Sequence, residues 1–537
     1  MKENQFVSAG LNIIESEEGA VKLASTNNVF VDQFASAGNY LSPRDLSAIF
    51  KDTEVLWAAD PTLSVKFIFY LRMISRDTKH NGKVYERQKG QGLRFESISR
   101  MLWLAYNHPK AFYNNLYLFA SVGSWKDVFD MLRMDLSLAG TERKYYLDWK
   151  KVFGTLTLGL SSENSNLIKK YMPTIRPKSK QKTFRFKYNS IIGKLFAKYL
   201  FDETDVIKRN WLYRQLKSSG NAHDWQQLIS EQAYNSIDFN TIPGIVLKKM
   251  VDSKFLDNHN LTDKYFEWIK TQDTVKYNGY VHDLFTDLTD KSSLARMLTT
   301  EAQFQHLVKN TKLSSNLLVV RDTSGSMTAA IKEGSKVTSF NVAKAMALYF
   351  SYFLKGEFSD CWVEFNRNAE MHKWNGGTAV AKWFHDTSSA YGSTNFLAVI
   401  DLLVSIKERG VAESEFPEGI LCLSDGEFSN NGCFNQTNYK AAIQKLKDAG
   451  FSKEYIDNFK IILWDIPNTF YGNRVKNKFE ESADTPNFFH IAGFDGSIIS
   501  FIVEGNRKTK SIPKTSEELF LAAMDQEILD LVQVSLK

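Results

Sequence analysis

The chain has 537 residues, 43% of them hydrophobic and 24% charged, which is enough for two or more globular domains with buried cores. No apolar run approaches the roughly 18 residues of a membrane span, and Met1 is not followed by a basic and then an apolar segment. The three cysteines lack the spacing of a disulfide framework or a zinc site. We therefore expect a monomeric protein of a reducing, cytoplasmic compartment, with no membrane partner.

Charge is distributed unevenly along the chain. Residues 1–310 carry 43 Lys and Arg against 33 Asp and Glu, whereas the remainder carries 24 against 28. The first part is thus basic and the second acidic. This asymmetry points to a polyanionic partner for the first part.

After an N-terminal arm at 1–16, residues 17–310 have the pattern of helices joined by short loops. Apolar residues recur at three- and four-residue spacing, as in Ile98, Met101, Leu102 and Ala105. Strand-like alternation is scarce. We therefore predict an all-α module of stacked helix pairs, an α-solenoid, although no strict sequence period is present.

One stretch of this module is strongly basic. No acidic residue lies between Lys169 and Lys194, and aromatic residues are interleaved with the basic ones. Cations contact phosphates and aromatic rings stack on unpaired bases, so the stretch is a candidate RNA contact. The alternative is a solvated face over buried aromatics. The candidate RNA-binding residues are Lys169, Lys170, Arg176, Lys178, Lys180, Lys182, Arg185 and Lys187.

From 313 to 505 the pattern changes to short apolar runs separated by helical stretches. Continuous apolar strands alternating with helices predict a doubly wound α/β domain with a parallel sheet covered on both faces. We expect strands at 317–320, 361–365, 420–423, 461–464 and 488–491, and helices at 338–355, 394–408, 438–449 and 473–482. The remaining residues, 506–537, should form a C-terminal helix that packs on one of the two modules.

Oxygen-bearing side chains follow three of these predicted elements. Asp322, Ser324 and Ser326 alternate in a loop at the end of the first strand, Thr394 precedes a helix, and Asp425 ends another strand. Hard oxygen ligands suit Mg²⁺ or another divalent cation. Two alternatives stay open here: Thr378, in an earlier Gly-Gly-Thr loop at 376–378, could replace Thr394, and Asp322 and Ser324 could instead cap a helix.

This order of DxSxS, a later threonine and a later Asp-Gly resembles the metal-ion-dependent adhesion site (MIDAS) of von Willebrand factor A domains. The resemblance implies a Rossmann-like fold. It also implies a metal whose open position takes a carboxylate from a protein partner. No general base accompanies Asp322 in the sequence, so we do not expect an enzyme.

Short motifs in the helical part resemble the Ro ribonucleoprotein family and its TROVE module. They are RDTK at 76–79, GK at 82–83, ER at 86–87, GSWKDV at 123–128, WLYR at 211–214, IDFNTIP at 237–243 and VHD at 281–283. The resemblance implies a ring of HEAT-type helical repeats followed by a von Willebrand factor A domain. In such a protein the ring would hold structured or misfolded small non-coding RNA.

The leading hypothesis is therefore a non-catalytic RNA-binding protein. The alternative is a metal-dependent protein-interaction scaffold, in which a partner supplies a carboxylate to the metal. A third reading makes the chain a viral protein, in the host cytoplasm or in a virus particle. A metal-dependent nuclease is the most distant alternative.

Overall fold

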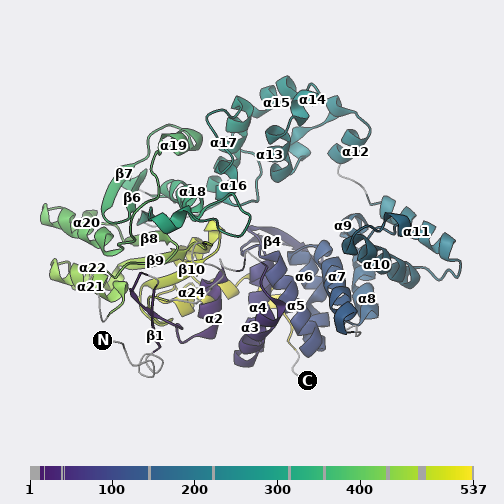
Figure 1. Ribbon diagram of the computed structural model, residues 1–537, viewed down its shortest axis with the longest axis horizontal. Helices are drawn as coiled ribbons and strands as arrows, with labels where there is room; N and C mark the ends of the chain where they lie inside the picture. Colours follow the sequence, from purple (N-terminus) through teal and green to yellow (C-terminus); the bar gives the residue numbers. More distant parts are fainter. Residues whose placement is uncertain are drawn as a thin grey trace. The chain divides into compact units, whose positions relative to one another are not determined.

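The computed structural model describes residues 12–16, 18–37, 40, 43–142, 147–220, 224–311, 316–354, 358–430, 436–469 and 479–534. Its contacts divide the chain into two compact units. We call Met1–Ser42 with Pro243–Asp525 the α/β unit, and Pro43–Ile242 with Gln526–Lys537 the helical unit. This division differs from the ranges expected from sequence, because the N-terminal segment and residues 243–310 group with the sheet (Figure 1).

The helical unit consists mainly of helices joined by short turns, as predicted. Capping residues set the boundary between its first two helices. The Asp60 side chain accepts from Leu63 N at the start of α4, where Pro61 occupies the first turn. The helices are α3 (Leu46–Ala59), α4 (Pro61–Arg72), α5 (Arg94–Asn107), α6 (Pro109–Val122), α7 (Trp125–Glu142), α8 (Trp149–Leu160), α9 (Ser165–Tyr171), α10 (Phe184–Leu200), α11 (Val206–Ser218) and α12 (Asp224–Ser230).

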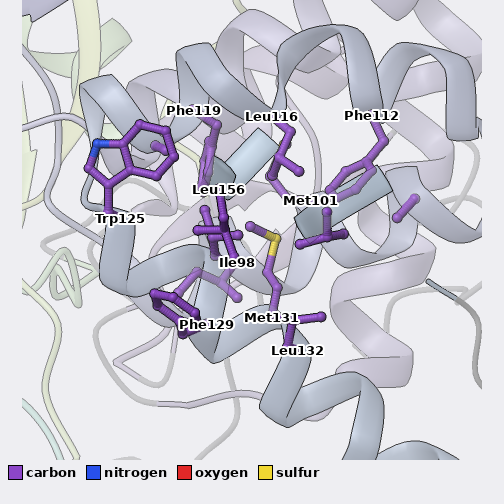
Figure 2. Close-up of a cluster of buried hydrophobic side chains, with 14 of the residues drawn as sticks. Ile98, Met101, Phe112, Leu116, Phe119, Trp125, Phe129, Met131, Leu132 and Leu156 are labelled. Carbon is purple, nitrogen blue, oxygen red and sulfur yellow. The ribbon is translucent and has the colours of Figure 1, made fainter. Parts of the chain in front are cut away.

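A hydrophobic core runs through α4 to α10 of this unit. Figure 2 shows side chains from α5, α6, α7 and α8 meeting in it, among them Met101, Phe119 and Leu156. The last turn of the chain, the 3₁₀ helix η9 (Glu527–Leu531), adds Ile528 and Leu529 to the same core. Residues more than 300 positions away in sequence thus complete the packing of the helical unit.

The expectation of an all-α module at 17–310 is wrong at two places: the short strand β2 (Val21–Leu23) and a hairpin further along the chain. Residues 76–88 form an antiparallel hairpin of β3 (Arg76–His80) and β4 (Lys83–Gln88). Its turn is Asn81-Gly82, with φ of 48° and 79°. Two consecutive residues at positive φ suit the right-handed twist of a hairpin, and Asn-Gly is the favoured pair there. The Asn-Gly dipeptide therefore indicates a hairpin, and the prediction of an all-α module did not take it into account.

The α/β unit contains a six-stranded sheet in the order β10-β9-β8-β5-β6-β7. The five predicted strands are confirmed within two residues at each end. The sheet is mixed rather than wholly parallel, because an unpredicted strand, β7, pairs antiparallel with β6 at the edge. The strands are β5 (Leu317–Asp322), β6 (Cys361–Phe365), β7 (Ala369–Lys373), β8 (Gly419–Ser424), β9 (Lys460–Asp465) and β10 (Phe488–Ala492).

Helices cover both faces of this sheet. Helices α20 and α21 contribute to a core with one face, and α18 packs on the other, where Phe350 lies 5.8 Å from Trp464 between ring centroids (Figure 1). The predicted helix at 473–482 lies mostly outside the described residues. The helices are α2 (Val29–Ala35), α13 (Gly244–Asp252), α14 (Phe255–Asn258), α15 (Thr262–Ile269), α16 (Val281–Phe285), α17 (Leu294–Lys309), α18 (Ser339–Ser351), α19 (Ala379–His385), α20 (Leu397–Glu408), α21 (Asn438–Asp448), α22 (Lys453–Asn458), α23 (Ile499–Glu504) and α24 (Ser516–Met524).

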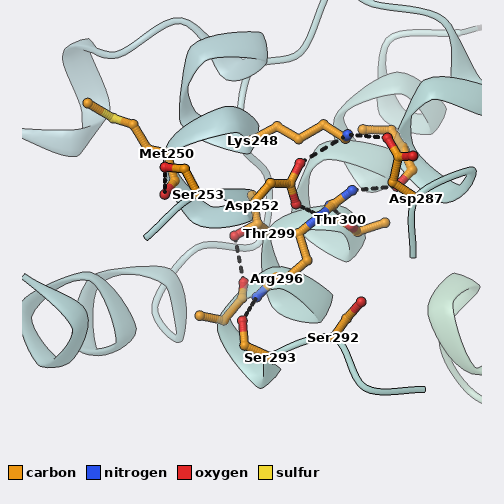
Figure 3. A network of polar contacts seen from close by, with 12 residues as sticks. Lys248, Met250, Asp252, Ser253, Asp287, Ser292, Ser293, Arg296, Thr299 and Thr300 are labelled. Carbon is orange, nitrogen blue, oxygen red and sulfur yellow. Dashed lines mark hydrogen bonds and ion pairs between the residues drawn. The ribbon is translucent and has the colours of Figure 1, made fainter. Parts of the chain in front are cut away.

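A buried ionic network joins the helices that precede the sheet (Figure 3). Arg296 on α17 is 3% exposed and pairs with Asp252 at the end of α13 at 2.5 Å. It also donates to the Leu284 carbonyl at 2.9 Å. Because a buried guanidinium is costly unless paired, this pair fixes how α13, α16 and α17 meet.

The C-terminal segment contains α24, which packs against α2 and β10 within the α/β unit. An additional short hairpin of β1 (Ile13–Glu15) and β2 (Val21–Leu23) belongs to the same unit. No helix within the described ranges is both long and apolar enough to cross a membrane.

Candidate metal centre and basic surface

Three acidic residues lie at the carboxyl ends of three adjacent parallel strands. Asp322 ends β5 and Asp465 ends β9, while Asp425 follows β8, which lies between them. Carboxyl ends of parallel strands meet at one edge of a sheet, where such folds bind ligands. The edge therefore gathers three carboxyl groups, of which that of Asp322 is fully buried and those of Asp425 and Asp465 are half-buried.

The first predicted loop turns its oxygens toward this edge. Asp322 Oδ1 accepts from Ser324 N at 2.7 Å, and Ser324 Oγ lies 3.2 Å from Ser326 Oγ. The Ser326 hydroxyl hydrogen-bonds to Asp425. All three residues of the loop are at most 6% exposed. The structure thus brings Asp322, Ser324 and Ser326 together with Asp425, which follows β8.

Thr394 lies in a loop that packs on the first one. Gly325 N donates to Gly392 O at 3.1 Å, which joins the two loops. The Thr394 side chain is fully buried, and its Oγ1 has no hydrogen-bond partner among the described residues. An unpaired buried hydroxyl is costly, so this oxygen fits a ligand that the protein itself does not supply. The rival Thr378 is exposed and caps α19 instead.

The carboxyl groups at this edge of the sheet repel one another, which favours binding of a cation there. Burial raises the pKa of Asp322, and the charge of Asp425 raises it further. Burial likewise raises the pKa of Asp425, and raises that of Asp465 to about 8, with added repulsion from Asp425. A divalent ion would offset these like charges and hold the carboxylates ionised. Carboxylate and hydroxyl oxygens are the ligands that Mg²⁺ takes in proteins.

Sequence reasoning missed two residues of this site. Asp465 directly follows the apolar run at 461–464, so an aspartate at a strand end was the available signal. Lys22, from β2, is 1% exposed, donates to Gly426 O at 2.7 Å and pairs with Glu480 at 2.6 Å. No local pattern marks a lysine that lies about 400 residues from its partners.

A second group of potential metal ligands lies on β6 and β7. Glu364, Glu370 and His372 place one ligand atom each within 4.8 Å of one another. Glu364 faces Glu370 directly in the antiparallel register. The group is partly exposed and lies on the two strands at the β7 edge of the sheet, where Glu364 is in register with Arg321 of β5.

The predicted basic residues lie on α9, on the 3₁₀ turn η2 (Lys178–Lys180) and on α10 of the helical unit. Lys178, Lys180, Lys182, Arg185 and Lys187 are exposed. Lys169, Lys170 and Arg176 are half-buried, and the Arg176 guanidinium lies 4.1 Å from the centre of the Phe186 ring. Within the part of the chain that the structure describes, none of the eight pairs with a carboxylate. Phe184 is 75% exposed, so at least one of the interleaved aromatics is not buried.

Helix α11 extends this surface with residues that the sequence reading did not include. Trp211 is 53% exposed and Ile207 82% exposed, and Arg214 is exposed on the next turn. The spacing of four and three residues places these side chains on one face. A pocket of about 330 Å³ beside them is lined by Lys170, Arg214, Lys217, Ser218, Gly220 and Gln226.

Two family models match parts of the chain. The first, "Domain of unknown function (DUF2828)", matches residues 16–155, and the second, "Domain of unknown function (DUF7788)", matches residues 316–527. The second match contains the whole six-stranded sheet and the candidate ligands Asp322, Ser324, Ser326, Thr394 and Asp425. The chain is also similar to "Uncharacterized protein L728" of Acanthamoeba polyphaga mimivirus. The two are 20% identical over 485 residues, which are 83% of this chain and 77% of that protein.

Proposed function

We propose that this chain is a non-catalytic RNA-binding protein in which the helical unit contacts the RNA. The observation that supports this proposal best is the basic surface of the helical unit. Residues 164–201 include ten Lys and Arg and no Asp or Glu. Helices α10 and α11 contact each other, and both carry exposed aromatic residues, such as Phe184 and Trp211, as well as exposed basic residues. Cations for phosphates and rings for unpaired bases are what single-stranded RNA requires.

The proposal also draws on the resemblance to Ro ribonucleoproteins and their TROVE module. In that reading the helical unit corresponds to HEAT-type repeats, and the sheet corresponds to a von Willebrand factor A domain. The strand order, with five parallel strands and one antiparallel edge strand, is compatible with such a domain. The oxygen cluster around Asp322 would then be its metal-ion-dependent adhesion site.

In this site Asp322, Ser324, Ser326, Thr394 and Asp425 would hold Mg²⁺ or another divalent cation. The ion would supply positive charge that binds an anionic oxygen. The protein residues orient the ligand oxygens: Ser424 Oγ and Ser324 N each hold one oxygen of Asp322. Asn468 Nδ2 donates to Asp425 Oδ2 at 2.5 Å. We assign no general base to the site, so the function proposed is binding.

RNA binding can be tested directly with a fluorescent RNA that has a stem and a single-stranded tail. Replacing Arg185 and Lys187 by glutamate should weaken binding strongly, because two attractive contacts become repulsive. Lys51→Glu and Lys150→Glu, at exposed positions of α3 and α8, are the matched controls. With six or more phosphate contacts, affinity should fall at least about a thousandfold between about 50 and 200 mM salt. Absence of binding at the lower salt would refute the proposal.

A second candidate function is a metal-dependent protein-interaction scaffold. The observation that favours it is the buried oxygen cluster, since a site built mainly of hydroxyls leaves a coordination position for a partner's carboxylate. Pull-down of a protein by the wild type but not by Asp322→Ala would support this function. A raised ratio of absorbance at 260 to 280 nm in the purified protein would favour RNA instead. The mimivirus relative is consistent with a viral role in either case.

A further inference from the structure

The N-terminal hairpin of β1 and β2 lies on the loop that follows Asp425. Asn430 N donates to the Glu18 carbonyl at 3.2 Å, and Ser16 Oγ donates to Phe428 O at 2.9 Å. Gly19 forms an antiparallel bridge with Ser429. These bonds connect residues about 410 positions apart and belong to one compact unit. The turn of the hairpin is therefore positioned at the rim of the candidate metal centre.

Ser429 links the Glu18 side chain to Thr394 of the proposed metal site. Ser429 Oγ donates to the Glu18 carboxylate and accepts from Thr394 N at 3.1 Å. Ser429 N in turn donates to Thr394 O at 2.8 Å. One residue thus separates the Glu18 carboxylate from the buried Thr394, whose Oγ1 has no partner among the described residues.

Glu18 is bonded to the loop that follows Asp425, because Asn430 N donates to its carbonyl and Ser429 Oγ donates to its carboxylate. The hairpin thus brings a fourth carboxylate to the loops that carry Asp322, Asp425 and Asp465. The cation from the same hairpin, Lys22, is already paired with Glu480 at 2.6 Å. Glu18 would add repulsion to an already acidic site unless a cation is bound there.

We propose that Glu18 is an additional, in-chain carboxylate of the metal centre, which occupies the side where an adhesion site takes a partner's carboxylate. This inference rests on the proposed metal site. Glu18 interacts with the bound cation directly or through a water molecule, and the cation in turn holds the hairpin on the 426–430 loop. Metal binding and docking of the N-terminal segment are therefore coupled, and the site is satisfied within the chain.

The test compares Mn²⁺ binding, measured by calorimetry, in the full-length wild type, Glu18→Gln and Glu15→Gln. Glu15 is exposed on the same hairpin, so its variant is the matched control. We expect Glu18→Gln to weaken Mn²⁺ binding by about 10- to 100-fold, the usual effect of losing a ligand-orienting or ligating group. Glu15→Gln should bind as the wild type does. Equal affinity of Glu18→Gln and wild type would overturn the inference.

Hydrogen exchange supplies the second readout. Mn²⁺ should slow amide exchange at residues 18–23 in the wild type and in Glu15→Gln, but much less in Glu18→Gln. Protection that is equal in all three proteins would contradict the coupling. Asp322→Ala separates the two proposals: if it loses Mn²⁺ while Glu18→Gln does not, the metal site stands and the role of Glu18 fails. If the wild type binds no Mn²⁺, the metal site and the role of Glu18 fail together.

Discussion

Ser424 Oγ, at the end of β8, donates a hydrogen bond at 2.5 Å to Oδ2 of Asp322, at the end of the adjacent strand β5. The other oxygen of the same carboxylate accepts from Ser324 N. Both oxygens are thus oriented by the protein, and one of the two donors comes from a strand 100 residues later. A carboxylate held in this way is preorganised for a cation, since little side-chain entropy remains to be lost on binding.

Asp322 should be required for stabilisation by metal. Mg²⁺ at about 100 times its Kd should raise the free energy of unfolding of the wild type by about 2.7 kcal/mol, because it binds the folded state alone. Asp322→Ala should show no such gain in thermal or urea unfolding. Glu408→Gln, at an exposed position on α20, is the control and should respond as the wild type does. A full metal response in Asp322→Ala would rule out the proposed ligand set.

The metal-free protein should lose stability as pH rises. Burial raises the pKa of Asp322 and Asp425, and that of Asp465 to about 8. At these three carboxyl groups the folded state binds more protons than the unfolded state up to about pH 8, so they make the free energy of unfolding fall as pH rises. The buried His282 and His490, whose pKa values are lowered, act in the opposite direction below about pH 6.5. Urea unfolding in EDTA at about pH 6.5 and pH 8 therefore measures the effect of the carboxyl groups.

Saturating Mg²⁺ should reduce or abolish this pH dependence, because a cation favours the ionised carboxylates. Asp465→Asn should flatten the metal-free profile without removing it. Metal-free stability that is constant or rises from about pH 6.5 to pH 8 would contradict the electrostatic description of the site.

Trp211 should contribute to binding of single strands by stacking. Trp211→Ala should weaken the affinity for an unstructured oligonucleotide by about 1–3 kcal/mol, as is typical for loss of one stacked base. Leu158→Ala removes another exposed apolar side chain of the helical unit, 68% exposed on α8, and should have little effect. If both variants bind alike in a fluorescence titration, α11 is not part of the RNA surface.

Arg321 and Asp386 form a buried ion pair next to the metal loop. Their side chains are 0% and 3% exposed and lie 2.6 Å apart. Asp386→Asn would leave the guanidinium without its charge partner, so the free energy of unfolding should fall by about 3–5 kcal/mol. Asp448→Asn on the exposed end of α21 is the control. A loss under about 1 kcal/mol would show that the guanidinium finds other compensation.

The Asn81-Gly82 turn gives a local test of the hairpin. Gly82 has φ of 79°, and a Cβ there would meet no atom within 4 Å. Gly82→Ala should therefore lower the free energy of unfolding by about 1 kcal/mol through backbone strain alone. Gly377→Ala, at a position equally open but without positive φ, is the control. Unchanged stability in Gly82→Ala would argue against the turn geometry.

Local pattern was sufficient for five of the six strands of the sheet and for the spacing of the oxygens in the Asp322–Ser326 loop. Strands β5, β6, β8, β9 and β10 could be predicted because buried parallel strands are nearly continuous apolar runs. The spacing of Asp322, Ser324 and Ser326 follows from one turn of chain. Strand β7 was not predictable in this way, since an exposed edge strand has no continuous apolar run.

The sequence by itself thus determined the class of each part, the basic stretch and the aspartates at strand ends. Only the tertiary structure placed Glu18 and Lys22 beside the loop after Asp425, placed the Thr394 loop rather than Thr378 against the Asp322 loop, and exposed Trp211 on the helix that packs on α10. The physical reason is range: helices, strands and turns depend on neighbours a few residues apart. The site depends on hydrogen bonds and charges between segments some 100 to 400 residues apart.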